Sequence, residues 1–204
     1  IADTAVLPRW IRVDQLVEYT EKTHPRFSRV RCDELLKRTN IPARARVGSL
    51  SKGMVVQLHL SIVMSIDARF LVLDEPTLGL DILFRTEFYR TLIEEYFEAD
   101  KTILVTTHQV EEVENLLSDV LFMDAGQIVL SESLQSIGER YVLVSAAREN
   151  SAQLASMGPL HKTSAFGRDV FLFNNRTREE LAPLGELSTP NVADVFVATI
   201  RAGQ

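Results

Sequence analysis

The sequence predicts an α/β fold, with a helical segment ahead of it and a small α+β unit after it. Residues 67–139 alternate short apolar runs with amphipathic stretches, which is typical of a parallel sheet with crossover helices. Residues 69–73 form a continuous apolar run bounded by turn residues, so we expect a strand that is buried on both faces. Residues 1–66 and 140–204 lack this alternation.

Composition and charge narrow the class of protein. The chain has 204 residues, of which 46% are hydrophobic and 25% charged, as in a soluble globular protein. It contains no run of about 18 apolar residues, so we expect no membrane-spanning helix. The net charge of −6 is uneven, because residues 67–139 contain 16 Asp+Glu and only 4 Lys+Arg. That acidic segment argues against the binding of a polyanion there without a metal.

Residues 1–66 are expected to be helical. Apolar positions at helical spacing predict a first helix over 13–24, which Pro25 ends. Ser28 is suited to cap a second helix, and Ser51 a strongly apolar third helix.

The later elements follow from the same patterns. In residues 67–139 we expect strands at 69–73, 102–106, 119–123 and 127–131, helices at about 83–97 and at 109–117, and a hairpin turn at 124–127. In residues 140–204 we expect strands at 141–145 and 170–173 and a final helix carrying an apolar stripe at 192, 195, 196 and 200. The sequence therefore predicts a helical part over 1–66, an α/β core portion over 67–139 and a C-terminal accessory domain over 140–204.

Two carboxylates follow the strand at 69–73. Asp74 and Glu75 lie where a buried strand delivers its last side chains to the carboxyl edge of the sheet, which is where open α/β sheets bind ligands. One carboxylate there is suited to hold Mg²⁺, and the other to activate a water molecule. His108 follows the strand at 102–106 and is expected at the same edge.

A phosphate group is the expected ligand of the third helix. The N-terminus of a helix presents free N–H groups and the positive end of the helix dipole. Ser51 stands at that position, Gly53 allows the backbone to approach a ligand closely, and the charge of Lys52 favours an anion.

Residues 50–131 resemble the nucleotide-binding subunit of ATP-binding cassette (ABC) transporters, because several motifs occur in the order that this family has. Residues 50–54 resemble its signature loop, 70–75 its Walker B strand with the catalytic Glu, 79–81 its D-loop, 106–108 its switch histidine and 122–128 the hairpin that follows. The resemblance implies a partial P-loop NTPase fold of the ABC type, with a helical subdomain and a small C-terminal α+β appendage.

The resemblance also implies roles for single residues. Asp74 would hold Mg²⁺, Glu75 would polarise the attacking water, and His108 would meet the γ-phosphate of ATP. Ser51, Lys52 and Gly53 would face the nucleotide held by a second copy, and Asp81 would reach that copy in a head-to-tail dimer.

The partners that the resemblance implies are a second ATPase subunit and a separate membrane permease of the exporter type. ATP and Mg²⁺ would be the cofactors, and no nucleic acid is expected. The protein would lie at the cytoplasmic face of the membrane, attached through the permease. A soluble ABC-type ATPase that acts on DNA or ribosomes, and a non-catalytic interaction module, are the alternatives.

Three departures from the family pattern stand out. The phosphate-binding loop Gly-x-x-x-x-Gly-Lys-[Ser/Thr] does not occur in the sequence, so we expect a fragment that lacks an N-terminal portion of roughly 80 residues. Lys52 and Met54 replace two residues of the familiar signature loop, Leu-Ser-Gly-Gly-Gln. Asp3 stands near the position of a Mg²⁺-sensing Gln, and the resemblance implies that it contacts the metal.

The missing loop leads to a prediction. The phosphate cradle and its Lys supply most contacts to the nucleotide in such proteins, so these 204 residues alone should not bind ATP at micromolar concentrations. Titration calorimetry of this chain with Mg²⁺ and ATP checks this. Stoichiometric binding would mean that other residues replace the loop.

Overall fold

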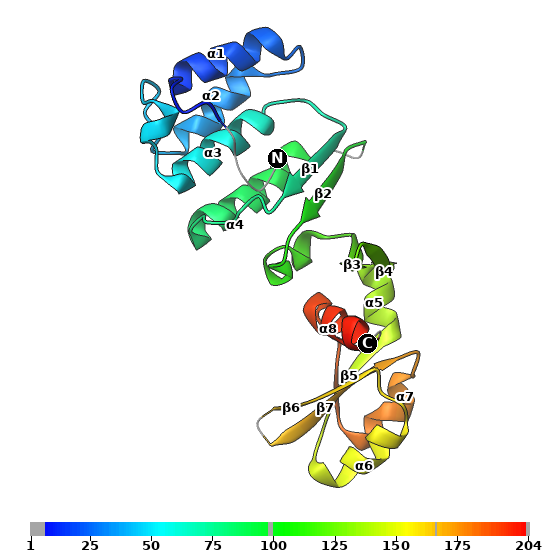
Figure 1. Cartoon of the computed structure of the whole chain (residues 1–204). Helices are drawn as coiled ribbons and strands as arrows, with labels where there is room; N and C mark the ends of the chain where they lie inside the picture. Colours follow the sequence, from blue (N-terminus) through cyan, green and yellow to red (C-terminus); the bar gives the residue numbers. More distant parts are fainter. Residues whose placement is uncertain (1–6, 98–99, 166, 203–204) are drawn as a thin grey trace. The chain divides into compact units, whose positions relative to one another are not determined.

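The computed structural model describes residues 7–97, 100–165 and 167–202. It divides the chain into two compact units, Ile1–His108 and Gln109–Gln204, and each is described by itself. The boundaries expected after residues 66 and 139 fall inside these units, so the division into three domains stays a prediction. None of the helices in the described ranges combines the length and apolar character that crossing a membrane requires. Figure 1 shows the elements coloured along the sequence.

Three helices open the first unit: α1 (Val13–Thr23), α2 (Arg29–Lys37) and α3 (Lys52–Val63). Their apolar sides meet in one core, in which Cys32 and Leu58 are fully buried. The predicted caps are confirmed, because the hydroxyl groups of Ser28 and Ser51 accept hydrogen bonds from backbone N–H groups three residues later. A short 3₁₀ helix, Val47–Ser49, leads into α3.

A parallel strand pair follows. β1 (Phe70–Asp74) and β2 (Thr102–Thr106) lie in register, with Phe70 opposite Thr102 and Asp74 opposite Thr106. Between them α4 (Ile82–Thr91) continues into a π-helical turn, Leu92–Tyr96. Parallel strands need such a crossover connection, so the predicted strand–helix–strand unit is confirmed.

The prediction that β1 is buried on both faces is wrong for this structure. Leu71 and Leu73 are 5% and 0% exposed, but Phe70 and Val72 are 58% and 39% exposed. The reason is that β1 pairs only with β2 among the described residues, and no described element covers this face of the pair. Leu104 of β2 lies opposite Val72 and is also exposed.

The second unit begins with a segment that was expected to form a helix. Residues 109–117 form two 3₁₀ turns, Val110–Glu112 and Glu114–Leu116, instead of the predicted helix. Glu111 and Glu114 would carry like charges one helical turn apart, which disfavours an α-helix. The Glu114 carboxylate instead accepts a hydrogen bond of 2.9 Å from the backbone N–H of Val192.

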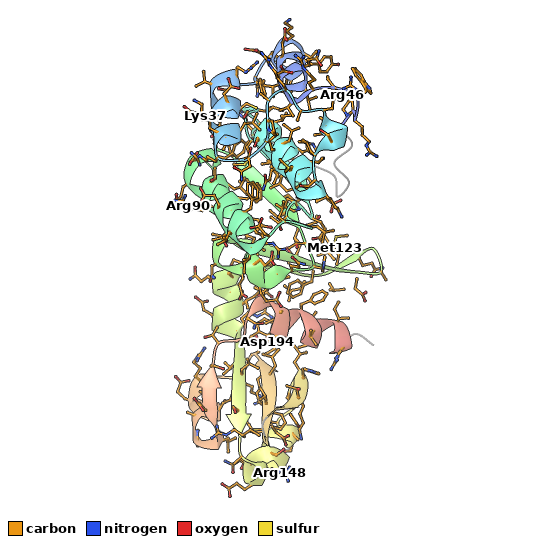
Figure 2. All side chains as sticks on the ribbon, turned by 90° about the vertical axis from the view of Figure 1, so that its left-hand side faces the viewer. Lys37, Arg46, Arg90, Met123, Arg148 and Asp194 are labelled. Atoms are coloured by element: carbon orange, nitrogen blue, oxygen red, sulfur yellow. The ribbon has the colours of Figure 1, made fainter. Side chains whose placement is uncertain are left out.

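The predicted hairpin is confirmed. β3 (Asp119–Asp124) and β4 (Gln127–Ser133) pair antiparallel around a two-residue turn. Ala125 and Gly126 have φ angles of 46° and 79° there, as a turn that matches the twist of a hairpin requires. The described part of β3 pairs only with β4, whereas we expected it to continue the parallel sheet. Met123, labelled in Figure 2, is 63% exposed on this hairpin.

The rest of the second unit is a four-stranded antiparallel sheet with the order β6-β7-β5-β8. The strands predicted near 141–145 and 170–173 are confirmed as β5 and β7, and the final helix as α8. The connectivity is β-α-β-β-α-β, known as the split β-α-β pattern. Its elements, with the helices on either side, are α5 (Leu134–Arg140), β5 (Tyr141–Ala146), α6 (Arg148–Ser156), β6 (His161–Ala165), β7 (Arg168–Asn174), α7 (Arg178–Leu181), β8 (Glu186–Ser188) and α8 (Val192–Ala202).

Helices cover both faces of this sheet. Side chains alternate between the faces of a strand. Phe171 and Phe173 of β7 therefore share a core with Leu154 of α6 and Leu181 of α7. Leu172 points the other way, into a core with α8 and the β3–β4 hairpin. Figure 1 shows α6 and α7 beside the sheet, in yellow and orange.

The apolar face of the β1–β2 pair predicts self-association. Phe70, Val72 and Leu104 lie exposed together, and each strand has an unpaired edge among the described residues. Sedimentation should therefore detect a species larger than one chain that dissociates on dilution. Phe70→Lys should favour the monomer, and Tyr19→Lys, at an exposed site on α1, should not. A strictly monomeric parent chain would contradict the prediction.

A close backbone approach in the second unit gives a stability prediction. A Cβ atom on Gly185 would lie 2.7 Å from the carbonyl oxygen of Ser145 and 2.9 Å from Cγ1 of Val144. Gly185→Ala should therefore lower the free energy of unfolding by about 1–3 kcal/mol. Gly138 of α5 is the matched control: a Cβ there would meet Thr189 only at 3.8 Å. Gly138→Ala should leave stability unchanged or raise it by up to about 1 kcal/mol.

Chemical denaturation followed by circular dichroism measures both variants. Equal stability of the two proteins would show that the chain relaxes around Gly185 without cost.

Candidate active site

The carboxylates of Asp74 and Glu75 lie at the carboxyl end of β1, as predicted from the sequence. Asp74 is the last residue of the strand and its side chain is exposed. Glu75 leaves the strand with a φ angle of 44°, which is uncommon for a residue with a side chain. Its backbone N–H still donates to the carbonyl oxygen of Thr106 at 2.9 Å. The chain thus turns sharply at Glu75 while this residue remains attached to β2.

The carboxyl end of β2 meets both carboxylates. His108 approaches Glu75 twice: its backbone N–H donates to Oε1 at 2.8 Å, and its ring Nδ1 lies 2.7 Å from the same oxygen. Thr107 Oγ1 donates to the other oxygen, Oε2, at 3.1 Å. Thr106 Oγ1 donates to Oδ1 of Asp74. The parallel register explains the meeting, because it aligns the two strand ends.

The side chains of Glu75 and His108 differ in their exposure to solvent. The side chain of Glu75 is 20% exposed and that of His108 is 64% exposed. The carboxylate is thus mostly surrounded by protein, with the imidazole on its solvent side. A carboxylate in that position is able to accept a proton from a water molecule, and an imidazole beside it is able to orient the reacting group.

The donor set at Asp74 fits Mg²⁺. Mg²⁺ is usually held by one or two carboxylates together with water and phosphate oxygens, and not by a cage of protein ligands. Asp74 offers an exposed carboxylate, and the described residues contain no cluster of three or more His, Cys, Asp or Glu side chains arranged to hold a metal. An exposed carboxylate of this kind suits an ion that arrives with a phosphate ligand.

The first turn of α3 forms a second group. Ser51 is the N-cap of α3, and its Oγ accepts from the backbone N–H of Met54 at 3.2 Å. A Cβ atom on Gly53 would lie 3.8 Å from the carbonyl oxygen of Gly79, and one on Gly79 would lie 3.7 Å from Cε of Lys52. The turn that contains Ser51 therefore lies directly against the loop that follows Glu75.

Asp81 belongs to this second group. It is the N-cap of α4, and its Oδ1 accepts from the backbone N–H of Phe84 at 3.0 Å. Together with the first turn of α3 and the end of α2 it lines a groove of about 640 Å³. The groove offers the free N–H groups of a helix N-terminus, which favour an anion.

The structure thus brings the predicted residues together in two groups. Asp74, Glu75 and His108 form one, and Ser51, Lys52, Gly53 and Asp81 form the other. Asp3 lies outside the described residues. Their functional roles remain predictions. Sequence reasoning assigned no role to Thr106 and Thr107, although in-register pairing of two strands of equal length would have placed them opposite Asp74 and Glu75.

Comparison with known proteins shows what the chain is similar to. No family model matches the chain. It is 31% identical to the ABC transporter ATP-binding protein YtrB of Bacillus subtilis over 143 residues, which are 69% of this chain and 48% of YtrB. It is 29% identical to the Nod factor export ATP-binding protein I of Neorhizobium galegae over 177 residues, 80% of this chain and 51% of that protein.

The chain is related to the ATP-binding proteins of ABC transporters. It spans about half the length of the curated ABC relatives it matches. Among solved structures, it is similar to one assigned as a cobalt transport ATP-binding protein, cbiO-2. The TM-score is 0.56 at 18% identity, over 94% of this chain and 68% of the other. The fold is thus the predicted one, part of an ABC-type P-loop NTPase fold with additional helical and α+β parts.

Proposed function

We propose that this chain is the part of an ABC transporter ATPase that carries the general base and the switch histidine, and that it supplies half of each ATP site in a head-to-tail dimer. The contact between Glu75 and His108 at the joined ends of β1 and β2 carries this proposal. It places a carboxylate that is able to accept a proton beside an imidazole, at the sheet edge where ligands bind.

The roles of the residues follow from their surroundings. Glu75 accepts the proton of the attacking water, and His108 holds Glu75 in place through its backbone and its ring. Asp74 would hold Mg²⁺ through its exposed carboxylate. Mg²⁺, when bound, neutralises the charge that develops on the phosphate oxygens.

The second group acts toward another copy. The N–H groups at the start of α3, with Ser51, Lys52 and Gly53, receive the phosphates of a nucleotide whose remaining contacts come from the partner copy. Asp81 caps α4 and holds the loop that lies against them. Catalysis then needs a phosphate-binding loop from outside these 204 residues, since the sequence contains none.

The transporter assignment rests on the relatives. YtrB is named as an ABC transporter ATP-binding protein, and the protein of Neorhizobium galegae is named for export. We infer that this ATPase drives a separate permease and works at the cytoplasmic face of the membrane. The acidic character of residues 67–139 supports a partner other than nucleic acid.

Substitution of the base tests the proposal. In a protein that joins this chain to a phosphate-binding loop, Glu75→Gln should keep ATP binding and lower the turnover rate by about 100-fold or more, the scale of a lost general base. His108→Ala should behave similarly, because it removes the ring that contacts Glu75. Phosphate release and nucleotide binding are measured for each.

Two matched controls separate this effect from a change of surface charge. Glu179→Gln on α7 and His161→Ala on β6 make the same replacements in the second unit and should leave turnover unchanged. A turnover rate of Glu75→Gln within a few-fold of the parent protein would assign the base to another residue.

A further inference from the structure

The hydroxyl groups of Thr106 and Thr107 each meet a different carboxylate. Thr106 Oγ1 donates to Oδ1 of Asp74, and Thr107 Oγ1 donates to Oε2 of Glu75 at 3.1 Å. Thr106 is the last residue of β2 and Thr107 follows it, just as Asp74 ends β1 and Glu75 follows it. The parallel register sets Asp74 beside Thr106, and Glu75 turns out of the strand with a φ angle of 44°.

We propose that Thr106 and Thr107 are positioning residues: Thr106 orients Asp74 as the metal ligand, and Thr107 orients Glu75 as the base. This one-to-one pairing of threonines with carboxylates is called the sorting of the carboxylates below. The catalytic meaning of this sorting rests on the proposed function. The pairing of each threonine with one carboxylate is a property of the strand pair itself.

Each hydroxyl engages one oxygen of its carboxylate. On Glu75, Thr107 engages Oε2 while the backbone N–H and the ring of His108 engage Oε1, so both oxygens of the carboxylate are held. On Asp74, Thr106 engages Oδ1, and Oδ2 is not part of this contact. A base and a metal ligand one residue apart are thereby kept in separate orientations.

Threonine is better suited to this task than serine. Its β-branched side chain has few χ1 rotamers and favours strand conformation, so its hydroxyl points in a set direction at a strand end. Serine can make the same hydrogen bond but loses this stiffness. We therefore expect Thr107→Ser to restore most, and Thr107→Val none, of the effect of the hydroxyl.

The first arm of the test uses this chain. Carboxyl carbons of Asp and Glu are labelled with ¹³C, and the resonances of Asp74 and Glu75 are read by magic-angle-spinning NMR, which tolerates self-association. Thr107→Val should shift the Glu75 resonance and leave that of Asp74 unchanged. Thr106→Val should do the reverse. Thr102→Val, at an exposed site on the same strand, should shift neither.

The NMR result decides whether each threonine contacts only one of the two carboxylates. Unchanged resonances, or equal shifts of both in either variant, would overturn the sorting. Thr107→Ala replaces Thr107→Val if circular dichroism finds that the valine variant does not fold.

The second arm measures kinetics in a protein that joins this chain to a phosphate-binding loop. Thr107→Val should lower kcat by about 10- to 100-fold with KM for ATP unchanged, because a displaced base affects the transition state. Thr107→Ser should recover to within about threefold of the parent, the size of a small change in one hydrogen bond. Thr106→Val should raise the Mg²⁺ concentration for half-maximal rate by about 10-fold, the scale of a lost partner of a metal ligand.

The NMR measurement and the kinetic measurement test different parts of the proposal, so each can be contradicted without the other. Selective NMR shifts without any ATP hydrolysis by the parent protein would overturn the proposed function and leave the sorting in place. Selective shifts with an unchanged kcat in Thr107→Val would overturn the positioning role of Thr107. An unchanged Mg²⁺ dependence in Thr106→Val would overturn that of Thr106.

Discussion

The in-register parallel pairing of β1 with β2 is the constraint on which the candidate site depends. The two strands are separated by 27 residues of chain between Asp74 and Thr102, yet their carboxyl ends coincide because Asp74 pairs with Thr106. A slip of one residue would move every side chain of one strand to the other face. Glu75 would then no longer meet Thr107 and His108. The left-handed backbone of Glu75 is tolerated because hydrogen bonds from Thr107 and His108, which follow β2, hold its side chain.

The crossover between these strands also connects them to the helical part of the first unit. Tyr96, at the end of the π-helical turn, is 1% exposed. Its ring centre lies 5.4 Å from the guanidinium group of Arg31 and 4.8 Å from the ammonium group of Lys101. Its hydroxyl donates to the carbonyl oxygen of Ile66 at 3.0 Å. One buried aromatic residue thus contacts α2, the chain that follows α3 and the chain that enters β2.

Glu95 adds a polar part to the same connection. Its carboxylate accepts from Arg38 at 2.9 and 3.3 Å, and its backbone carbonyl accepts from Arg31 at 2.7 Å. Ion pairs this exposed contribute little stability, so the buried ring of Tyr96 is the stronger link. Through these contacts the helices that present Ser51 are held to the crossover whose strands present Glu75. The two groups of site residues are therefore positioned by one continuous set of contacts within the first unit.

The amino-acid sequence by itself determined the elements and the chemical groups that they carry. Helix caps at Ser28 and Ser51, the hairpin turn before Gln127 and the Asp74–Glu75 pair after an apolar run are local signals, because each depends on a few neighbouring residues. The tertiary structure alone decided which groups meet: the contact of Thr107 with Glu75 and the bond from Val192 to Glu114 join residues 32 and 78 positions apart. It also decided the split β-α-β order of the second unit, where polar segments such as β6 form strands only because β7 offers a partner. Strand pairing and register depend on burial and hydrogen bonds between distant segments. The periodicity within one segment does not reveal these contacts.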